Sequence, residues 1–366
     1  MAGNSSLSAA KDAKNDEFYT QLTDKLTDIE KELRHYRKHF KDKTVLCNCD
    51  DPFESNFFKY FVLNFNRLGL KKLIATCYAT SPIMGQQLSL FDVVGGDEGK
   101  KGKPYKAVVT KVYDVTGDGG VDMFDVAELF KQGENELVEL DGDGDFRSRE
   151  CMGLLEEADI VVTNPPFSLF RQYVSTLVDF EKDFVIIGPD KGRKYKETFP
   201  LIRDNKMWLG ATNPKRFYVP DSYQSDSVKV DDDGRRYMQM GNICWYTNLD
   251  IKKRHEELIL FQRYAPEKYP SYTNFDGIDV AHVSDIPCDY AGAMGVPINY
   301  LDSYNPEQFE IIGLGEGDLA KEISITRNHE GRTKLEYQDG NGAYKRPFAR
   351  IVVRNKHPEQ PKEVQQ

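Results

Sequence analysis

One short segment combines residues that could hold an amino group in place for chemistry: Asn164, Pro165, Pro166 and Phe167. The side-chain carbonyl of Asn164 and the main-chain carbonyl of Pro165 offer two acceptors to one NH2 group, and Phe167 offers a face for a flat ring. The segment follows the apolar run 160–163, so we expect it at the carboxyl end of a buried strand, where open α/β sheets bind ligands. This pattern favours methyl transfer to an amino nitrogen over a Pro-Pro turn without a chemical role.

The elements that position this segment predict a parallel sheet. Apolar residues recur at three- and four-residue steps from 18 to 40, which predicts an amphipathic helix. A strand at 44–47, a helix at 57–65 and a strand at 71–77 then form a βαβ unit, and such units build parallel sheets with a ligand crevice. The later elements that the sequence predicts are strands at 160–163, at 184–188, near Trp208 and at 243–246, and a helix at 168–180.

Composition divides the chain into several parts. Residues 1–15 are rich in Ser, Ala, Asn and Lys and are predicted to be disordered. Residues 16–250 carry the regular alternation of elements and are predicted to form the catalytic domain. A Gly-rich and charged insertion, with a hairpin arm at 105–115 and a short helix after it, interrupts this domain at about 79–142. Residues 251–366 show weaker periodicity and predict a second, less regular region.

The charge and composition exclude several classes of protein. The 366 residues include 59 acidic and 49 basic side chains, and a formal net charge of −10 argues against a protein that coats nucleic acid indiscriminately, although a local basic face remains compatible. No apolar run approaches the roughly 18 residues that span a bilayer, and the amino terminus is polar rather than signal-like. Six scattered cysteines show no disulfide framework. We therefore expect a cytoplasmic protein with no membrane partner.

Two further segments are candidates for binding a small molecule at the same edge of the sheet. Asp50, Asp51 and Pro52 follow the first strand, where an acidic group can approach a cationic or hydroxyl-bearing cofactor; a plain turn and helix cap is the alternative. The turn lacks G-x-G-x-x-G, which disfavours a dinucleotide. Asp145 could accept hydrogen bonds from the amino group of an adenine, and Phe146 could pack on its ring.

Two clusters imitate metal sites, and we reject both. The aspartates within 141–145 resemble the start of an EF-hand loop, but the loop lacks the Gly at its sixth position and the Glu at its twelfth. His35 and His39, with Cys47 and Cys49, have a composition that suits zinc, but the Cys-x-Cys spacing is too tight and falls on a core strand. No G-x-S-x-G elbow is present either. The sequence therefore predicts no metal and no Ser or Cys nucleophile.

Several motifs occur in the order seen in adenine-N6 DNA methyltransferases of restriction-modification systems. They are 16–20 (Asp-Glu-Phe-Tyr-Thr), 51–53 (Asp-Pro-Phe), 144–146 (Gly-Asp-Phe) and 164–167 (Asn-Pro-Pro-Phe). With this set the sequence resembles the EcoRI methylase family. The resemblance extends through 241–248 and 304–310, so it covers most of the chain. One departure is that Glu54, Ser55 and Asn56 stand where the family has a glycine-rich turn.

The resemblance implies an α/β fold: the Rossmann-like sheet of S-adenosylmethionine-dependent methyltransferases, with helices on both faces and a DNA target-recognition region at 251–366. It implies site-specific transfer of a methyl group to N6 of an adenine flipped out of double-stranded DNA, with 164–167 as the catalytic segment. A cognate restriction endonuclease acting on the same site would be a partner. By the resemblance, S-adenosylmethionine would contact Phe18, Tyr19, Thr20, Asp50, Asp51, Pro52, Asp145 and Phe146.

Contacts to DNA phosphates are expected from a basic cluster just after the predicted strand 184–188: Lys191, Arg193, Lys194 and Lys196. A solvated charged face is the alternative for this cluster, and Lys215-Arg216, 252–254, Lys345-Arg346, Arg350 and Arg354 are further candidates. Three other functions would use the same chemistry or fold. They are methylation of an RNA amino group, methylation of a protein glutamine, and DNA binding by a catalytically idle homologue.

Overall fold

The computed structural model describes residues 27–48, 55–77, 104–214, 216–218, 226–231, 234, 236–239 and 241–360. The chain folds into two compact units: Met1–Gly192 with Gly210–Leu249, and Arg193–Leu209 with Asp250–Gln366. The sequence predicts a boundary after residue 250 and places 193–209 in the catalytic domain, whereas this segment belongs to the second unit. The ion pairs that hold it there join Arg193 to Asp302, Lys194 to Glu316 and Arg203 to Glu322.

The first unit contains a large mixed sheet in which the strands lie in the order β4-β3-β2-β1-β5-β6-β11. The neighbours from β2 to β6 run parallel, whereas β3 and β11 run antiparallel to their neighbours. The predicted α/β class is therefore confirmed, with a mixed rather than a purely parallel sheet. The strands are β1 Thr44–Cys47, β2 Lys72–Thr76, β3 Tyr105–Val109, β4 Glu136–Glu139, β5 Ile160–Thr163, β6 Asp183–Pro189 and β11 Ile243–Thr247.

Capping residues mark the ends of several helices of this unit. Ser55 caps α4 by accepting a hydrogen bond from the Phe58 N–H, and Ser148 caps α8 in the same way. Gly69, with φ of +65°, ends α5 in the left-handed conformation. The helices are α2 Thr27–Leu33, α3 Arg37–Phe40, α4 Asn56–Leu63, α5 Phe65–Leu68, α7 Met123–Lys131, α8 Arg149–Glu157 and α9 Phe170–Asp179, with the 3-10 turn η2 Arg34–Tyr36 between α2 and α3. A small separate sheet contains β8 Arg216–Tyr218, β10 Arg236–Gln239 and β9 Val228–Val230.

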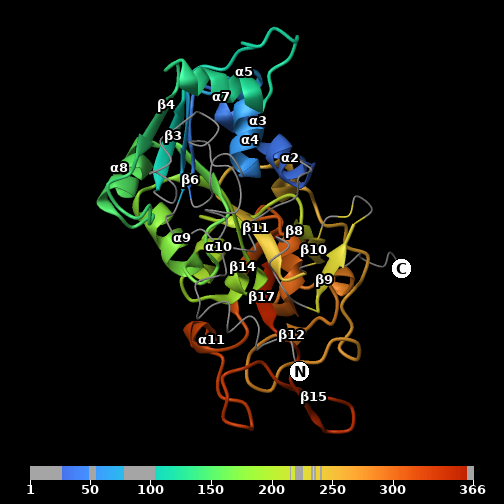
Figure 1. The fold of residues 1–366 in the computed structure, drawn as a ribbon. Helices are drawn as coiled ribbons and strands as arrows, with labels where there is room; N and C mark the ends of the chain where they lie inside the picture. Colours follow the sequence, from blue (N-terminus) through green and yellow to red (C-terminus); the bar gives the residue numbers. More distant parts are fainter. Residues whose placement is uncertain are drawn as a thin grey trace. The chain divides into compact units, whose positions relative to one another are not determined.

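Helices pack against both faces of the large sheet (Figure 1). Two neighbouring residues of β11 show this, because side chains alternate between the faces of a strand. Trp245 packs edge-on against Phe57 of α4, with ring centroids 6.0 Å apart, and Tyr246 packs against Phe170 of α9 at 5.0 Å. Strands covered on both faces are mostly apolar, and every residue of β1, β5 and β11 is indeed buried.

The described part of the predicted insertion, 104–142, extends the sheet. β3 pairs with β2 and β4 pairs with β3, so these strands continue the sheet beyond the βαβ unit. The predicted hairpin arm at 105–115 is a strand only as far as Val109, where it pairs antiparallel with β2 and β4; its extension to 115 is wrong. The chain after it is tied down instead, since the Val112 carbonyl accepts a hydrogen bond from the side-chain amide of Asn66 at 2.7 Å.

The side chain of Asp125 in α7 binds backbone N–H groups of the loop that precedes this helix. Its buried carboxylate accepts hydrogen bonds from the backbone N–H groups of Val115, Thr116 and Asp122, each at 2.9 Å. Burial raises the pKa of the Asp125 carboxyl, but the N–H donors outweigh burial, and the pKa is lowered from 3.8 to about 2. The ionised form is therefore the one that holds the loop.

We expect Asp125→Asn to destabilise the protein in a pH-dependent way. The folded-state pKa of Asp125 lies below its unfolded value, so the carboxylate contributes stability at and above about pH 4 and loses this contribution as the pH falls towards 2. Urea denaturation at about pH 7 should give a loss of about 2 kcal/mol for the variant. The two proteins should converge only at about pH 2 and below, where the carboxyl is protonated in the folded state as well. An equal difference at both pH values would contradict this role of the charge.

The second unit has a four-stranded sheet in the order β12-β13-β17-β14. β17 lies between β13 and β14 and runs antiparallel to both. The strands of this sheet are β12 Ile278–Asp279, β13 Met294–Pro297, β14 Phe309–Leu314 and β17 Arg350–Asn355. The unit also contains the short strands β7 Trp208–Leu209, β15 Tyr337–Gln338 and β16 Tyr344–Lys345. The helices are α10 Phe199–Arg203 and α11 Asp318–Glu322, with 3-10 turns η5 Lys252–His255, η6 Val283–Asp285 and η7 Ile298–Ser303.

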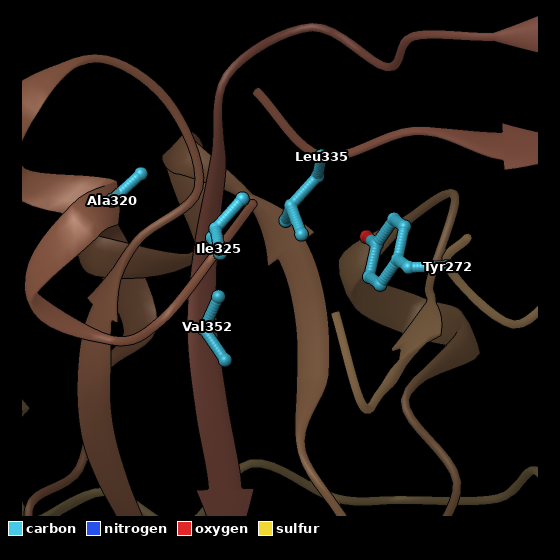
Figure 2. Close-up of a cluster of buried hydrophobic side chains, with 5 residues drawn as sticks. All are labelled: Tyr272, Ala320, Ile325, Leu335 and Val352. Carbon is cyan, nitrogen blue, oxygen red and sulfur yellow. The ribbon is translucent and has the colours of Figure 1, made fainter. Parts of the chain in front are cut away.

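A buried apolar cluster stabilises one side of this sheet (Figure 2). It joins α11 and β17 to the irregular segments around them through Tyr272, Ala320, Ile325, Leu335 and Val352. The region beyond residue 250 is thus irregular in its connections, as its weak periodicity predicts, yet it has its own core. In the part of the chain that the structure describes, no helix is long and apolar enough to span a membrane.

Candidate active site

Asn164 directly follows β5, which lies in the sheet between β1 and β6. The residue has no solvent exposure, and both Oδ1 and Nδ2 of its amide lack a hydrogen-bond partner among the described residues. An unpaired buried polar atom costs about 1–3 kcal/mol, so native structures rarely keep one without a reason. The fold therefore keeps an amide ready for a partner that a ligand can provide.

The rest of the segment forms the turn that leads into α9. Pro165 is buried, while Pro166 and Phe167 are half-buried. The Pro166 carbonyl accepts a hydrogen bond from the Leu169 N–H at 3.0 Å, which closes the turn. Phe167 is thus partly exposed, three residues after the buried Asn164. This combination can bind a flat ring through its face and hold an amino group through its hydrogen atoms.

The loop with Gly144, Asp145 and Phe146 lies against the carboxyl end of β2. A Cβ atom on Gly144, which has φ of +79°, would lie 2.2 Å from the carbonyl oxygen of Cys77, so only glycine fits there. Phe146 is buried and packs edge-on against Tyr173 of α9, with centroids 4.9 Å apart. The structure therefore brings this loop to the same edge of the sheet as Asn164.

Asp145 already has a partner within its own loop. Its carboxylate accepts hydrogen bonds from the Nε of Arg147 at 2.8 Å and from the Nη2 at 2.5 Å. An adenine amino group would have to share the carboxylate with this guanidinium. The other residues predicted to contact the cofactor lie outside the described residues: Phe18, Tyr19, Thr20, Asp50, Asp51 and Pro52.

The four residues of the basic cluster predicted to contact DNA differ in their exposure and in their ion pairs. Lys191 is exposed, and the Lys196 side chain is 77% exposed. Arg193 is buried, and its guanidinium donates two hydrogen bonds to Asp302 at 3.1 and 3.2 Å. Lys194 pairs with Glu316 at 2.8 Å. Lys191 and Lys196 are thus open to solvent, although Lys196 also lies 4.0 Å from the carboxylate of Glu197, whereas Arg193 and Lys194 stabilise the second unit.

Five of the further basic candidates have acidic or aromatic partners. Arg350 forms a buried ion pair with Asp279, and the Arg254 guanidinium lies 3.8 Å from the centre of the Trp208 ring. Lys215 lies outside the described residues, as does the side chain of Arg216. The more exposed candidates pair with single carboxylates: Lys345 with Asp339, Arg346 with Glu330 and Arg354 with Glu310.

Sequence comparison decides between the functions that this geometry allows. The model of a family described as adenine-specific methyltransferase EcoRI matches residues 6–356. The chain belongs to this family of adenine-specific methyltransferases. The predicted enzyme, an adenine-specific DNA methyltransferase, is thereby confirmed. The comparisons give no support to the RNA, protein-glutamine and idle alternatives.

Members of the adenine-specific methyltransferase family from bacteria align over almost the whole chain. The type II methyltransferase M.EcoRI of Escherichia coli is 42% identical over 363 residues, which cover 97% of this chain and 98% of the relative. M.MgeORF184P of Mycoplasma genitalium is 33% identical over 356 residues, covering 94% and 97%, and M.MpnI of Mycoplasma pneumoniae is 33% identical over 360 residues, covering 95% and 97%. No solved structure matches the chain.

For this methyltransferase, the sequence pattern missed part of the hydrogen-bonded surroundings of Asn164. Asn48, which follows β1, accepts hydrogen bonds from the hydroxyl groups of Thr163 and Tyr173. The only signal for Asn48 is a polar residue at the end of an apolar strand, and Tyr173 has the spacing of an ordinary core residue of α9. Among the residues that the structure describes, no group of His, Cys, Asp and Glu side chains could hold a metal ion.

Proposed function

We propose that this methyltransferase transfers the methyl group of S-adenosylmethionine to N6 of an adenine flipped out of duplex DNA. The observation that carries the proposal is the buried Asn164 amide, which has no partner among the described residues and stands at the end of a central strand, three residues before the half-buried Phe167. An adenine offers an amino group with two N–H donors and a flat ring. Among the described residues, nothing donates a hydrogen bond to Asn164 Oδ1, and the amino group of such a base would supply this donor.

The chain acts on the adenine through acceptors. The amino nitrogen is a weak nucleophile because its lone pair is delocalised into the ring. Asn164 Oδ1 and the Pro165 carbonyl each accept one N–H, which favours a more tetrahedral nitrogen with its lone pair available. Asn164 and Pro165 then hold this nitrogen in line for direct transfer, and this alignment supplies much of the rate. No dedicated general base is needed before transfer.

S-adenosylmethionine supplies an activated methyl group on a sulfonium. The carboxyl ends of β1, β2 and β5 suit such a ligand, because open α/β sheets bind ligands at this edge and the 144–146 loop, with its aromatic Phe146, lies there too. We propose that the cofactor is held by Phe18, Tyr19, Thr20, Asp50, Asp51, Pro52, Asp145 and Phe146, with Asp145 and Phe146 near its adenine.

The target amino group is buried in duplex DNA, so the base must leave the stack, and Phe167 is proposed as its stacking partner. We propose 251–366, with its own core, as the region that recognises the target sequence. Since the relatives are named type II methyltransferases of bacteria, we also propose a bacterial or phage-encoded enzyme that acts in the cytoplasm, with a cognate restriction endonuclease that cuts the same site.

The test of the function is methylation of mixed-sequence duplex DNA with labelled S-adenosylmethionine, followed by nucleoside analysis and mapping of the modified positions. We expect N6-methyladenine in one short sequence motif. Label in RNA or protein, with none in DNA, would keep the site chemistry but overturn the proposed substrate.

DNA binding should depend on Lys191 and Lys196 rather than on Arg193. We expect Lys191→Gln and Lys196→Gln each to reduce the slope of log affinity against log salt by about 1, because each removes one phosphate contact. Lys131→Gln, an exposed lysine on α7, is the control and should leave the slope unchanged. Arg193→Gln should instead lower the melting temperature, because it breaks the pair with Asp302. An unchanged slope in both lysine variants would remove this cluster from the DNA footprint.

A further inference from the structure

Asn48 joins two hydrogen bonds at the end of β1. Its main-chain carbonyl accepts a hydrogen bond from the Thr163 hydroxyl, and its side-chain Oδ1 accepts one from the Tyr173 hydroxyl. Thr163 and Tyr173 are each 1% exposed and Asn48 is 7% exposed, so neither bond competes with bulk water. The Asn48 group, as we call Asn48 with Thr163 and Tyr173, therefore forms a fixed joint between β1, β5 and α9.

The Asn48 group lies where the strands β1 and β5 end, directly before Asn164. The backbone pairing of β1 with β5 ends at Leu46 and Val161. Asn48 and Thr163 each lie two residues beyond this point, and their side-chain bond joins the strand ends where the ladder has stopped. Asn164 is the next residue after Thr163. The hydrogen bond of the Thr163 hydroxyl thus helps to fix the path of the backbone from β5 into the proposed catalytic segment.

The Asn48 group also contacts the 144–146 loop, which is proposed to bind the cofactor. The Tyr173 ring packs edge-on against Phe146, which is proposed to lie near the cofactor adenine. Asn48 itself precedes the Asp50 to Pro52 segment by two positions in the sequence. The Asn48 group therefore connects the end of β5 with the 144–146 loop, through Thr163 on one side and Tyr173 on the other.

We propose that Asn48 is a positioning residue, which through Thr163 and Tyr173 holds the Asn164 amide at a set distance from the cofactor side of the crevice. This proposal rests on the proposed function. The group contacts neither reactant, so it should affect the rate of transfer far more than the binding of either reactant. Misplacing a reacting group by about 1 Å can cost about 100-fold in rate.

Paired substitutions at Thr163 separate the hydroxyl from the shape of the side chain. Thr163→Val keeps the branched shape and removes the hydroxyl, whereas Thr163→Ser keeps the hydroxyl. In single-turnover assays with saturating duplex DNA and S-adenosylmethionine, we expect Thr163→Val to be slower by about 10-fold or more and Thr163→Ser to stay close to wild type. The dissociation constant for S-adenosylmethionine, measured by calorimetry, should change by less than about 3-fold.

Thr247→Val is the matched control for a purely structural effect. Thr247 is a fully buried threonine of the same sheet, and its hydroxyl donates to the Phe184 carbonyl at 2.7 Å, at the opposite end of the parallel strands. Its loss should lower the melting temperature but leave the single-turnover rate of the folded protein unchanged. If Thr247→Val and Thr163→Val slow transfer equally, the Asn48 group is only structural and the proposal is overturned.

A double variant tests whether the two hydroxyl groups act through one residue. Tyr173→Phe keeps the ring on Phe146 and removes the hydroxyl that donates to Asn48. We expect this variant to be slow, and the double variant Thr163→Val/Tyr173→Phe to lose less than the product of the single losses, because both bonds hold the same residue. Fully multiplicative losses, or a Thr163→Ser protein as slow as Thr163→Val, would overturn the proposal. A wild-type protein that does not methylate adenine in DNA would instead overturn the proposed function.

Discussion

Replacing Asn164 by alanine should abolish methyl transfer without weakening the fold. The substitution removes an acceptor aimed at the reacting amino group, and losses of about 100- to 1,000-fold are typical when one such preorganised contact is removed. It also removes a buried amide whose two polar atoms have no partner among the described residues, which relieves a cost of folding. We expect a single-turnover rate at least about 100-fold lower, with a melting temperature equal to or above that of the wild type.

A second asparagine provides the opposite control. Asn135 is also buried, but its Oδ1 accepts hydrogen bonds from the Thr110 and Lys111 N–H groups and its Nδ2 donates to the Lys111 carbonyl. Asn135→Ala should therefore lower the melting temperature and leave the transfer rate of the folded protein near wild type. Should Asn164→Ala melt lower than Asn135→Ala while still methylating DNA, Asn164 would be a structural residue and the assigned chemistry would be wrong.

The largest effect on stability is expected in the second unit, from Asp279→Ala. The Asp279 side chain is 4% exposed and accepts hydrogen bonds from the Arg350 Nε at 2.8 Å and from the Tyr272 hydroxyl at 2.6 Å. The variant leaves the buried Arg350 guanidinium without its carboxylate, and breaking such a pair from one side costs about 3–5 kcal/mol. Urea denaturation followed by the signal of the second unit should show this loss.

Two comparisons make the Asp279 result specific. Arg354→Ala breaks the ion pair with Glu310, in which both side chains are about half exposed, so it should cost less than about 1 kcal/mol. The double variant Asp279→Leu/Arg350→Met replaces the pair by apolar side chains and should recover much of the loss. Similar losses in Asp279→Ala and Arg354→Ala would mean that the buried pair is no stronger than an exposed one.

Local pattern alone predicted where the proposed catalytic segment lies in the fold. An apolar run followed by Asn-Pro-Pro-Phe predicts a strand that ends at Thr163, and β5 ends there. The reason is that strand formation in a covered sheet depends on consecutive apolar residues, and prolines stop the strand whatever lies elsewhere in the chain. The order of the short motifs was also sufficient to identify the family.

Only the tertiary structure decided which distant residues meet. Nothing in the sequence near Arg193 shows that its charge is neutralised by Asp302, 109 positions later, or that β3 extends the sheet by pairing with β2. Likewise, Asn48 and Tyr173 lie 125 positions apart and meet because the register of the sheet and the packing of α9 bring them together. Residue types and spacing therefore determined the chemistry proposed for the Asn164 segment. Strand order and register determined what holds that segment in place, because contacts between remote residues depend on the whole fold rather than on local preference.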